Sequence, residues 1–93
     1  MKFKRHNIRL ASGVRSHDSQ PMEDRSSVRA AISLMQSNIE PGATIFDLGC
    51  LEGGFSIELA RCGFDVTGVD ARASNIECAE FAKGNIGLNN VKF

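Results

Sequence analysis

The chain has 93 residues, which suffice for one small domain but leave no room for a large catalytic core. Because 11 Lys and Arg balance 11 Asp and Glu, the net charge is zero, and this balance indicates neither a nucleic-acid nor an anionic-membrane partner. No apolar run approaches the roughly 20 residues of a membrane span, and the basic start lacks the apolar stretch of a secretory signal, so we expect a cytoplasmic protein without a membrane partner.

The first 20 residues hold much of the positive charge. Five of the 11 basic residues precede the first acid, Asp18; they are Lys2, Lys4, Arg5, Arg9 and Arg15. An arm that reaches a phosphate-bearing substrate is one interpretation, but the strand signal is weak and no aromatic residues are interleaved for base stacking. We therefore expect a solvated or frayed tail that ends in the turn-rich segment 16–21, with His6 and His17 exposed.

A helix is the first regular element expected. Apolar residues from Val28 to Ile39 recur at helical spacing, and Pro41 ends the pattern. The apolar run 43–48 then predicts a parallel strand that helices cover on both faces. A second helix is expected over about 53–61, because Gly63 is well placed to end it.

The pattern of strand and helix continues to the end of the chain. A second strand is expected over 64–70 and a helix over about 74–83, where Ser74 and Glu77 have the spacing of a capping box. A loop over 84–90 leads to residues 91–93, which look like the opening of a third strand. This order predicts a partial, doubly wound, Rossmann-like parallel sheet of the α/β class, with three αβα layers. A sequence that stops within a strand also suggests a truncated product or a fragment.

The stretch 44–56 is where we expect the chemistry. It reads as a strand, a glycine-rich turn and the start of a helix, an arrangement that binds nucleotide-like ligands at the carboxyl end of a parallel strand. Asp47 would repel a pyrophosphate there but attract a sulfonium or an amine. The dinucleotide pattern GxGxxG is met by Gly49 and Gly54, whereas Leu51 replaces its middle glycine. Both features disfavour NAD.

Asp70, Cys50 and Glu52 are further candidates for a role near the turn. Asp70 ends the second strand 21 residues after Gly49, where a carboxylate can accept both hydroxyls of a ribose. Cys50 has no identifiable base nearby, so a small buried turn residue is favoured over a nucleophile. For Glu52, a solvated position and a ligand contact are equally good interpretations. Three cysteines without a CxxC spacing or clustered histidines predict reduced thiols and no metal site.

Three segments together resemble the N-terminal half of a class I S-adenosylmethionine-dependent methyltransferase: Phe46–Ser56, Val66–Asp70 and Asn90–Phe93. The resemblance extends over about residues 43–93. It implies a basic tail and linker over 1–22 and a partial cofactor-binding methyltransferase domain over 23–93.

The resemblance also implies which residues would bind S-adenosylmethionine. Asp47 falls on the acid that meets the amino group of the cofactor, and Asp70 on the acid that binds the ribose hydroxyls. The implied cofactor-binding set is Asp47, Leu48, Gly49, Cys50, Gly53, Asp70 and Ala71. No catalytic residue and no metal ligand are implied, because the substrate-facing part of the family lies beyond the third strand.

We therefore expect the cofactor-binding half of an enzyme that transfers a methyl group to a small-molecule or otherwise unidentified acceptor. Alone it should transfer little, since methyl transfer depends on aligning the acceptor with the methyl group. Two alternatives stay open. One is a fragment of an NAD-dependent oxidoreductase with an altered glycine turn. The other is a non-catalytic remnant that binds a partner, or a second copy, through the sheet edge left open after Phe93.

Overall fold

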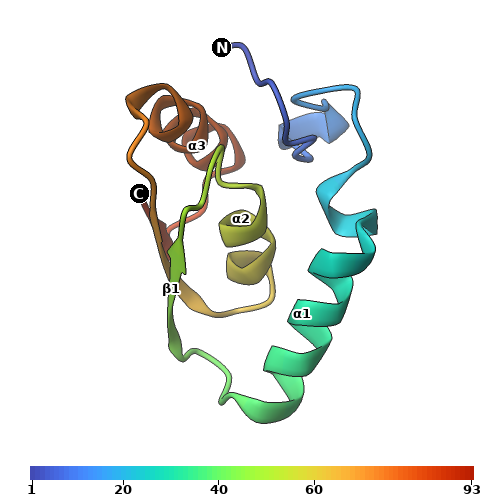
Figure 1. Ribbon diagram of the computed structural model, residues 1–93, viewed down its shortest axis with the longest axis vertical. Coiled ribbons are helices and arrows are strands. Elements are labelled where there is room, and N and C mark those ends of the chain that lie inside the picture. The colour runs from blue at the N-terminus through green and yellow to red at the C-terminus, as the bar shows by residue number, and fades with distance from the viewer.

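The computed structural model describes residues 1–93 as three parallel strands with helices (Figure 1). Two short 3₁₀ turns come first, η1 (Ala11–Gly13) and η2 (Met22–Asp24). The main elements are then α1 (Ser26–Asn38), β1 (Thr44–Leu48), α2 (Gly54–Arg61), β2 (Asp65–Val69), α3 (Ala73–Ile86) and β3 (Val91–Lys92). The strands pair in the order β1-β2-β3, and the predicted class, a partial Rossmann-like parallel sheet of the α/β class, is confirmed.

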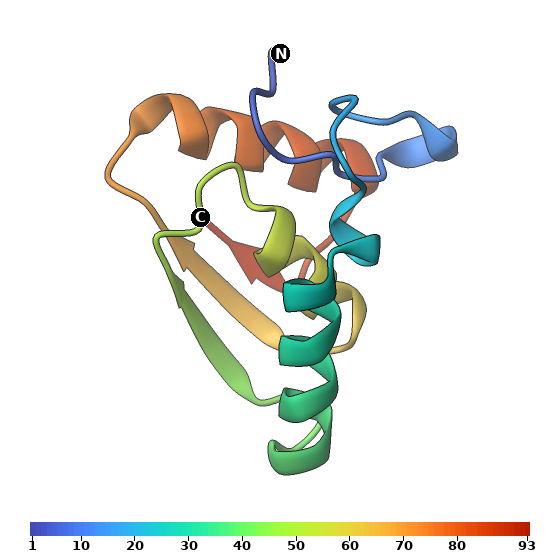
Figure 2. The same cartoon turned by 45° about the vertical axis from the view of Figure 1, so that its right-hand side comes forward.

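The core lies on the face of the sheet that α2 covers. Helix α2 lies between the sheet and α1 in both views (Figures 1 and 2), and most of its side chains are therefore buried. Ile57 and Leu59 are fully buried on it. The buried apolar side chains form two clusters, one around Ile57 and one around Leu59. The apolar stripe of α1, including Ile32 and Met35, packs against these clusters, as its spacing predicts.

The opposite face of the sheet is exposed within this chain. Strand β1 alternates between the two faces, so Ile45 packs against the core while Phe46 and Leu48 are 67% and 79% exposed. The expectation that helices cover both faces of β1 is therefore wrong for residues 1–93. The central strand is β2, which pairs with a neighbour on each side.

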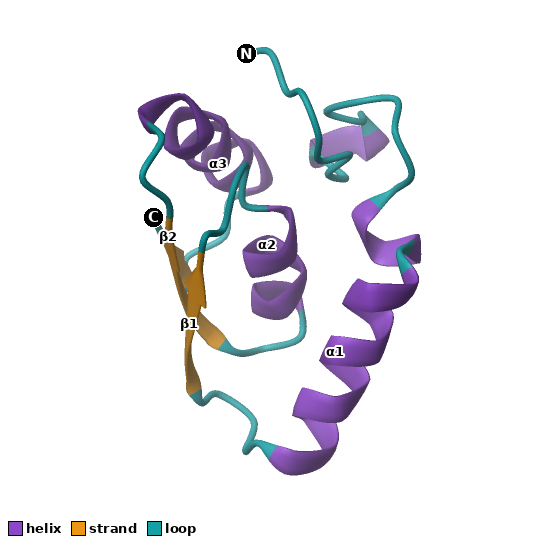
Figure 3. Ribbon diagram, viewed as in Figure 1, coloured by secondary structure: helices purple, strands orange, loops and turns teal.

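The first 20 residues are not a frayed tail. Phe3, Ile8 and Leu10 are buried in the same cluster as Ile57, and His6, expected to be exposed, is only 7% exposed. The expectation of a solvated segment is wrong because these apolar residues give only a weak periodic signal, and tertiary contacts bury them. Figure 3 shows the segment as loop, interrupted by η1, that runs beside α3 and α2 before α1 begins.

Helix α3 is longer than predicted and has a different cap. It begins at Ala73 with Arg72 as its N-cap, no side chain caps it, and the expected capping box of Ser74 and Glu77 does not form. It ends when Gly87 adopts the left-handed conformation at φ 84°. None of the helices combines the length and apolar character that crossing a bilayer requires.

Candidate functional site

The glycine-rich turn between β1 and α2 is fixed to the end of β2. The N–H groups of Gly49 and Cys50 both donate to the carbonyl oxygen of Val69, at 2.7 and 2.9 Å. Gly49 and Gly53 have positive φ angles, as glycine allows, but so does Leu51, at φ 52°. A leucine in this region is strained, and a hydrogen bond from its N–H to Asp70 Oδ2 (3.0 Å) supports it.

Asp70 organises the start of α3 as well as the turn. Its Oδ1 accepts the N–H of Arg72 at 2.9 Å and the side-chain amide of Asn75 at 3.1 Å. The hydrogen bond from Arg72 is the main cause that lowers the pKa of Asp70, so this carboxylate is ionised at neutral pH. Ala71, the next residue in the implied cofactor-binding set, is exposed. A carboxylate has about four lone-pair sites, so the three protein donors leave room for about one more.

Asp47 lies near the carboxyl end of β1, opposite Gly68 of β2. Its Oδ2 accepts the hydroxyl of Ser56, from the first turn of α2, at 2.7 Å, and no protein group donates to its Oδ1. Because side chains alternate along a strand, Leu48 lies on the opposite, exposed face of the sheet and only its backbone adjoins the turn.

Two glycines near the turn allow close packing that a side chain would prevent. A β carbon on Gly53 would lie 2.8 Å from Ala79 Cβ and 2.8 Å from Phe93 Cζ, so this residue lets α3 and β3 approach the turn. A β carbon on Gly68 would lie 2.7 Å from Phe93 Cε1. At Gly49, in contrast, nothing lies within 4 Å of that position, which leaves space at the end of β1.

Cys50 is buried beneath the turn, with 3% of its surface exposed. Burial, followed by the charges of Asp47 and Asp70, raises the pKa of its thiol to about 11. The thiol is therefore neutral at physiological pH, which makes it a poor nucleophile. Both carboxylates act on the same thiol, so both lie near this turn.

Glu52 is the residue whose role the sequence did not reveal. It is 2% exposed, and its carboxylate accepts the backbone N–H groups of Lys4 (2.6 Å), Arg5 (2.9 Å) and His6 (2.7 Å). Burial opposes its ionisation, but these donors and His6 together hold its pKa below the usual value. A solvated position is therefore wrong for Glu52. No local pattern could have indicated this contact, since the donors are backbone groups nearly 50 residues away.

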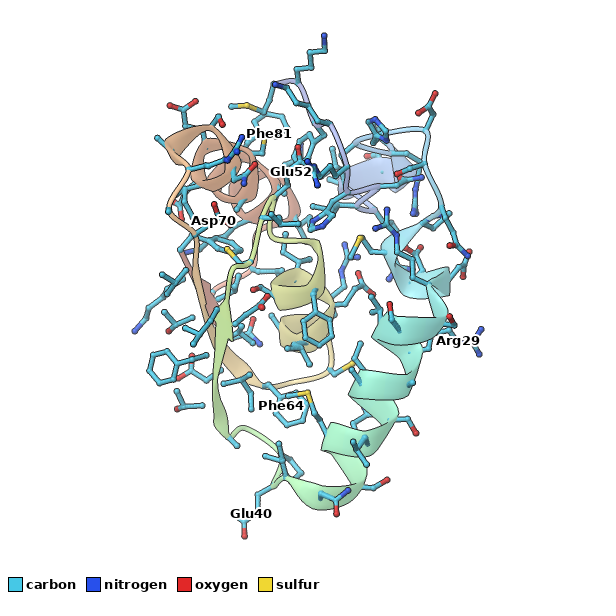
Figure 4. The ribbon with its side chains drawn as sticks, in the orientation of Figure 1. Arg29, Glu40, Glu52, Phe64, Asp70 and Phe81 are labelled. Carbon is cyan, nitrogen blue, oxygen red and sulfur yellow. The ribbon has the colours of Figure 1, made fainter.

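A cavity of about 400 Å³ opens beside the turn. Its lining comes from three segments and includes Lys4 and Arg5, Leu51 of the turn, and Arg72 and Ser74 at the start of α3. Figure 4 labels Glu52 and Asp70 at this end of the sheet, and Phe64 and Glu40 toward the other end. The implied cofactor-binding residues border this cavity but do not line it, and none of them lines the two other cavities.

Comparisons with known proteins agree on one class of activity. Residues 39–93 match a family model described as a methyltransferase domain. The 23S rRNA (uracil(1939)-C(5))-methyltransferase RlmD of Alkalilimnicola ehrlichii is 33% identical over 91 residues, which are 95% of this chain and 20% of the relative. The chain spans between 13% and 20% of the length of the curated relatives it matches.

Two solved structures are also similar to this chain. Coclaurine N-methyltransferase bound to N-methylheliamine and SAH is 26% identical, with a TM-score of 0.62 over 82% of this chain and 23% of that one. The N-terminal domain of EvdMO1, in the presence of SAH and D-fucose, is 25% identical, with a TM-score of 0.65 over 87% of this chain and 34% of that one.

Proposed function

Because the chain belongs to the methyltransferase family, we propose that it forms the cofactor-binding part of an S-adenosylmethionine-dependent methyltransferase. When bound, this cofactor supplies an electrophilic methyl group on a sulfonium centre. The work of the present chain is to bind and orient it. One similar solved structure is bound to SAH and the other was determined in its presence; SAH is S-adenosylhomocysteine, the demethylated form of the cofactor.

The observation that carries the proposal is the hydrogen bond between Leu51 N–H and Asp70 Oδ2, at 3.0 Å. It joins the glycine turn of β1 to the acid at the end of β2, at the carboxyl edge of a parallel sheet, where such folds bind nucleotide-like ligands. The open space at Gly49 and the exposure of Ala71 fit a nucleoside that lies across the ends of both strands.

The charges of the turn favour a cationic ligand. Asp47 keeps Oδ1 free of protein donors while Ser56 holds Oδ2, so it is oriented and can still accept from an amino group. We assign the ribose hydroxyls to Asp70. Since that carboxylate already accepts three protein hydrogen bonds, a second hydroxyl would have to replace one of them, and the Asn75 amide is the longest of the three at 3.1 Å.

For the acceptor, we propose a nucleobase in RNA. The support is the set of curated relatives, which are 23S rRNA (uracil-C5) methyltransferases. A small-molecule acceptor is the second candidate, because coclaurine N-methyltransferase is among the similar solved structures. The neutral net charge does not exclude RNA, because the basic residues cluster toward the N-terminus.

The experiment is a titration of the isotope-labelled chain with S-adenosylhomocysteine, followed by backbone amide NMR shifts. We expect the shifts to concentrate at Gly49–Leu51 and at Asp70–Arg72, and NAD to produce none. Asp70→Ala should abolish them, while Asp65→Ala, an exposed acid at the other end of β2, should not. Absence of shifts in the unmodified chain, or equal shifts with NAD, would overturn the proposal.

A further inference from the structure

The cavity beside the turn is rimmed by three cationic side chains that form no ion pair. Lys4, Arg5 and Arg72 all line it, all are exposed, and none forms a salt bridge. Their side chains also donate no hydrogen bond, in contrast to Arg15 and Arg61, which are both engaged by carboxylates. Three like charges gathered around one hollow repel one another unless an anion enters it.

The backbone of each of these residues is nevertheless held in place. Glu52 accepts the N–H groups of Lys4 and Arg5, at 2.6 and 2.9 Å, and Asp70 accepts that of Arg72, at 2.9 Å. Two carboxylates therefore fix the positions of three cationic residues through the main chain, while their side chains stay free. This differs from a solvated basic tail, whose charges would have no fixed arrangement.

The electrostatic balance of the cavity favours an anion. Glu52 is the one acid that lines it, and its carboxylate is 2% exposed and faces backbone N–H groups. The N-terminus of α3 adds a partial positive charge at the same place, and the hydroxyl of Ser74, in its first turn, has no hydrogen-bond partner. Guanidinium and ammonium groups of this kind are typical ligands of phosphate.

We propose that this cavity binds a phosphate group carried by the methyl acceptor. The inference rests on the proposed function, because it concerns the acceptor of the same enzyme. Leu51 lines the cavity and its N–H bonds to Asp70, so a phosphate bound there would lie next to the turn assigned to the cofactor. The cavity would then hold the acceptor's backbone or phosphate ester and leave the reacting base free to approach the methyl group.

The test compares two variants that lose the same charge. The first carries Lys4→Gln, Arg5→Gln and Arg72→Gln; the control carries Arg29→Gln, Lys83→Gln and Lys92→Gln, which remove three cations that line no cavity. Each is titrated with inorganic phosphate and with single-stranded RNA at several salt concentrations. S-adenosylhomocysteine binding is measured by NMR on the same samples.

We expect the first variant to lose at least about tenfold in RNA affinity, and its salt slope to fall by about 2, since each lost phosphate contact on a single strand removes about 0.7. The control variant should keep the RNA affinity and the salt slope of the unmodified chain. If inorganic phosphate alone binds no sample measurably, a loss of RNA affinity in the first variant would assign the phosphate to the RNA backbone. Loss of affinity for both ligands would assign it to a phosphate ester in general. A phosphate affinity that is measurable and unchanged in the first variant would overturn the inference.

Equal losses in the two variants would overturn the inference, because they would show a dependence on net charge alone. So would an unmodified chain that binds neither phosphate nor RNA. Failure of the proposed function looks different: S-adenosylhomocysteine would then cause no shifts in any sample, whether or not phosphate binds.

Discussion

The Glu52 carboxylate accepts the backbone N–H of His6 at 2.7 Å, although 46 residues separate the two. In return, His6 Nδ1 accepts the N–H of Gly54, at the start of α2, at 3.0 Å. The N-terminal segment and the glycine turn therefore hold each other from both sides. Because Glu52 lies inside the turn, the geometry of the candidate cofactor site depends on residues that precede the first helix.

Removal of the Glu52 carboxylate should destabilise the fold. Glu52→Ala leaves three backbone donors without their acceptor, and hydrogen bonds to a charged group contribute more than neutral ones, so we expect a loss of about 3 kcal/mol in the free energy of unfolding. The stability of Glu52→Gln should lie between that of the unmodified chain and that of Glu52→Ala, since glutamine keeps one acceptor oxygen. Urea denaturation measures this, with the exposed Glu40→Ala as the control. Similar losses for Glu40 and Glu52 would show that the contact is not structural.

Acidification should weaken the second contact between these segments, the hydrogen bond from Gly54 N–H to His6 Nδ1. Burial lowers the pKa of His6 below 6.5, because the neutral ring accepts from Gly54 in a desolvated position. The unfolded chain then binds a proton more readily than the folded one, so stability is fully present above pH 6.5 and falls as the pH drops toward the folded pKa.

The check is to compare unfolding free energies above and below pH 6.5 in the unmodified chain and in His6→Asn, whose side-chain oxygen can replace the acceptor without titrating. The loss over this range should shrink in His6→Asn. The control, His17→Asn, should retain it, since that ring bonds locally to Ser19 N–H. An undiminished loss in His6→Asn would assign the pH dependence to other groups.

The sequence predicted the fold better than it predicted the site. Strands and helices such as β1 and α2 follow from apolar period and glycine position, which are local signals. Burial of Phe3 and Ile8, and the contact of Glu52 with the N-terminal segment, arise from residues far apart in the chain, and no local pattern encodes them. The roles assigned to Asp47 and Asp70 remain predictions.

Leu51 is strained at the position where the GxGxxG pattern has glycine. Two substitutions separate the effect of its backbone conformation on stability from the effect of its side chain. Both Leu51→Gly and Leu51→Ala remove the side chain, but only glycine is relaxed at φ 52°. We expect Leu51→Gly to be more stable than Leu51→Ala by about 1 kcal/mol. Denaturation of the pair measures the difference, and equal stability would mean that the turn relaxes to another conformation.

Gly68 and Gly84 should respond to alanine with opposite signs. At Gly68, on β2, a β carbon would lie 2.7 and 2.8 Å from two ring atoms of Phe93 and 2.9 Å from Ser56 Oγ, so we expect Gly68→Ala to destabilise the fold by about 1–3 kcal/mol. Because Ser56 also donates to Asp47, this substitution should disturb the carboxylate assigned to the cofactor's amino group.

At Gly84, within α3, nothing lies within 4 Å of the added carbon, and alanine is the better helix former, so Gly84→Ala should stabilise by about 0.5–1 kcal/mol. Thermal unfolding of both variants beside the unmodified chain gives the two signs in one experiment. If Gly68→Ala were tolerated without loss, Phe93 would have to move away from β2, and the packing of β3 against the turn would need revision. A shift of the Asp47 side-chain carboxyl signal in Gly68→Ala alone would confirm that the contact through Ser56 transmits the strain.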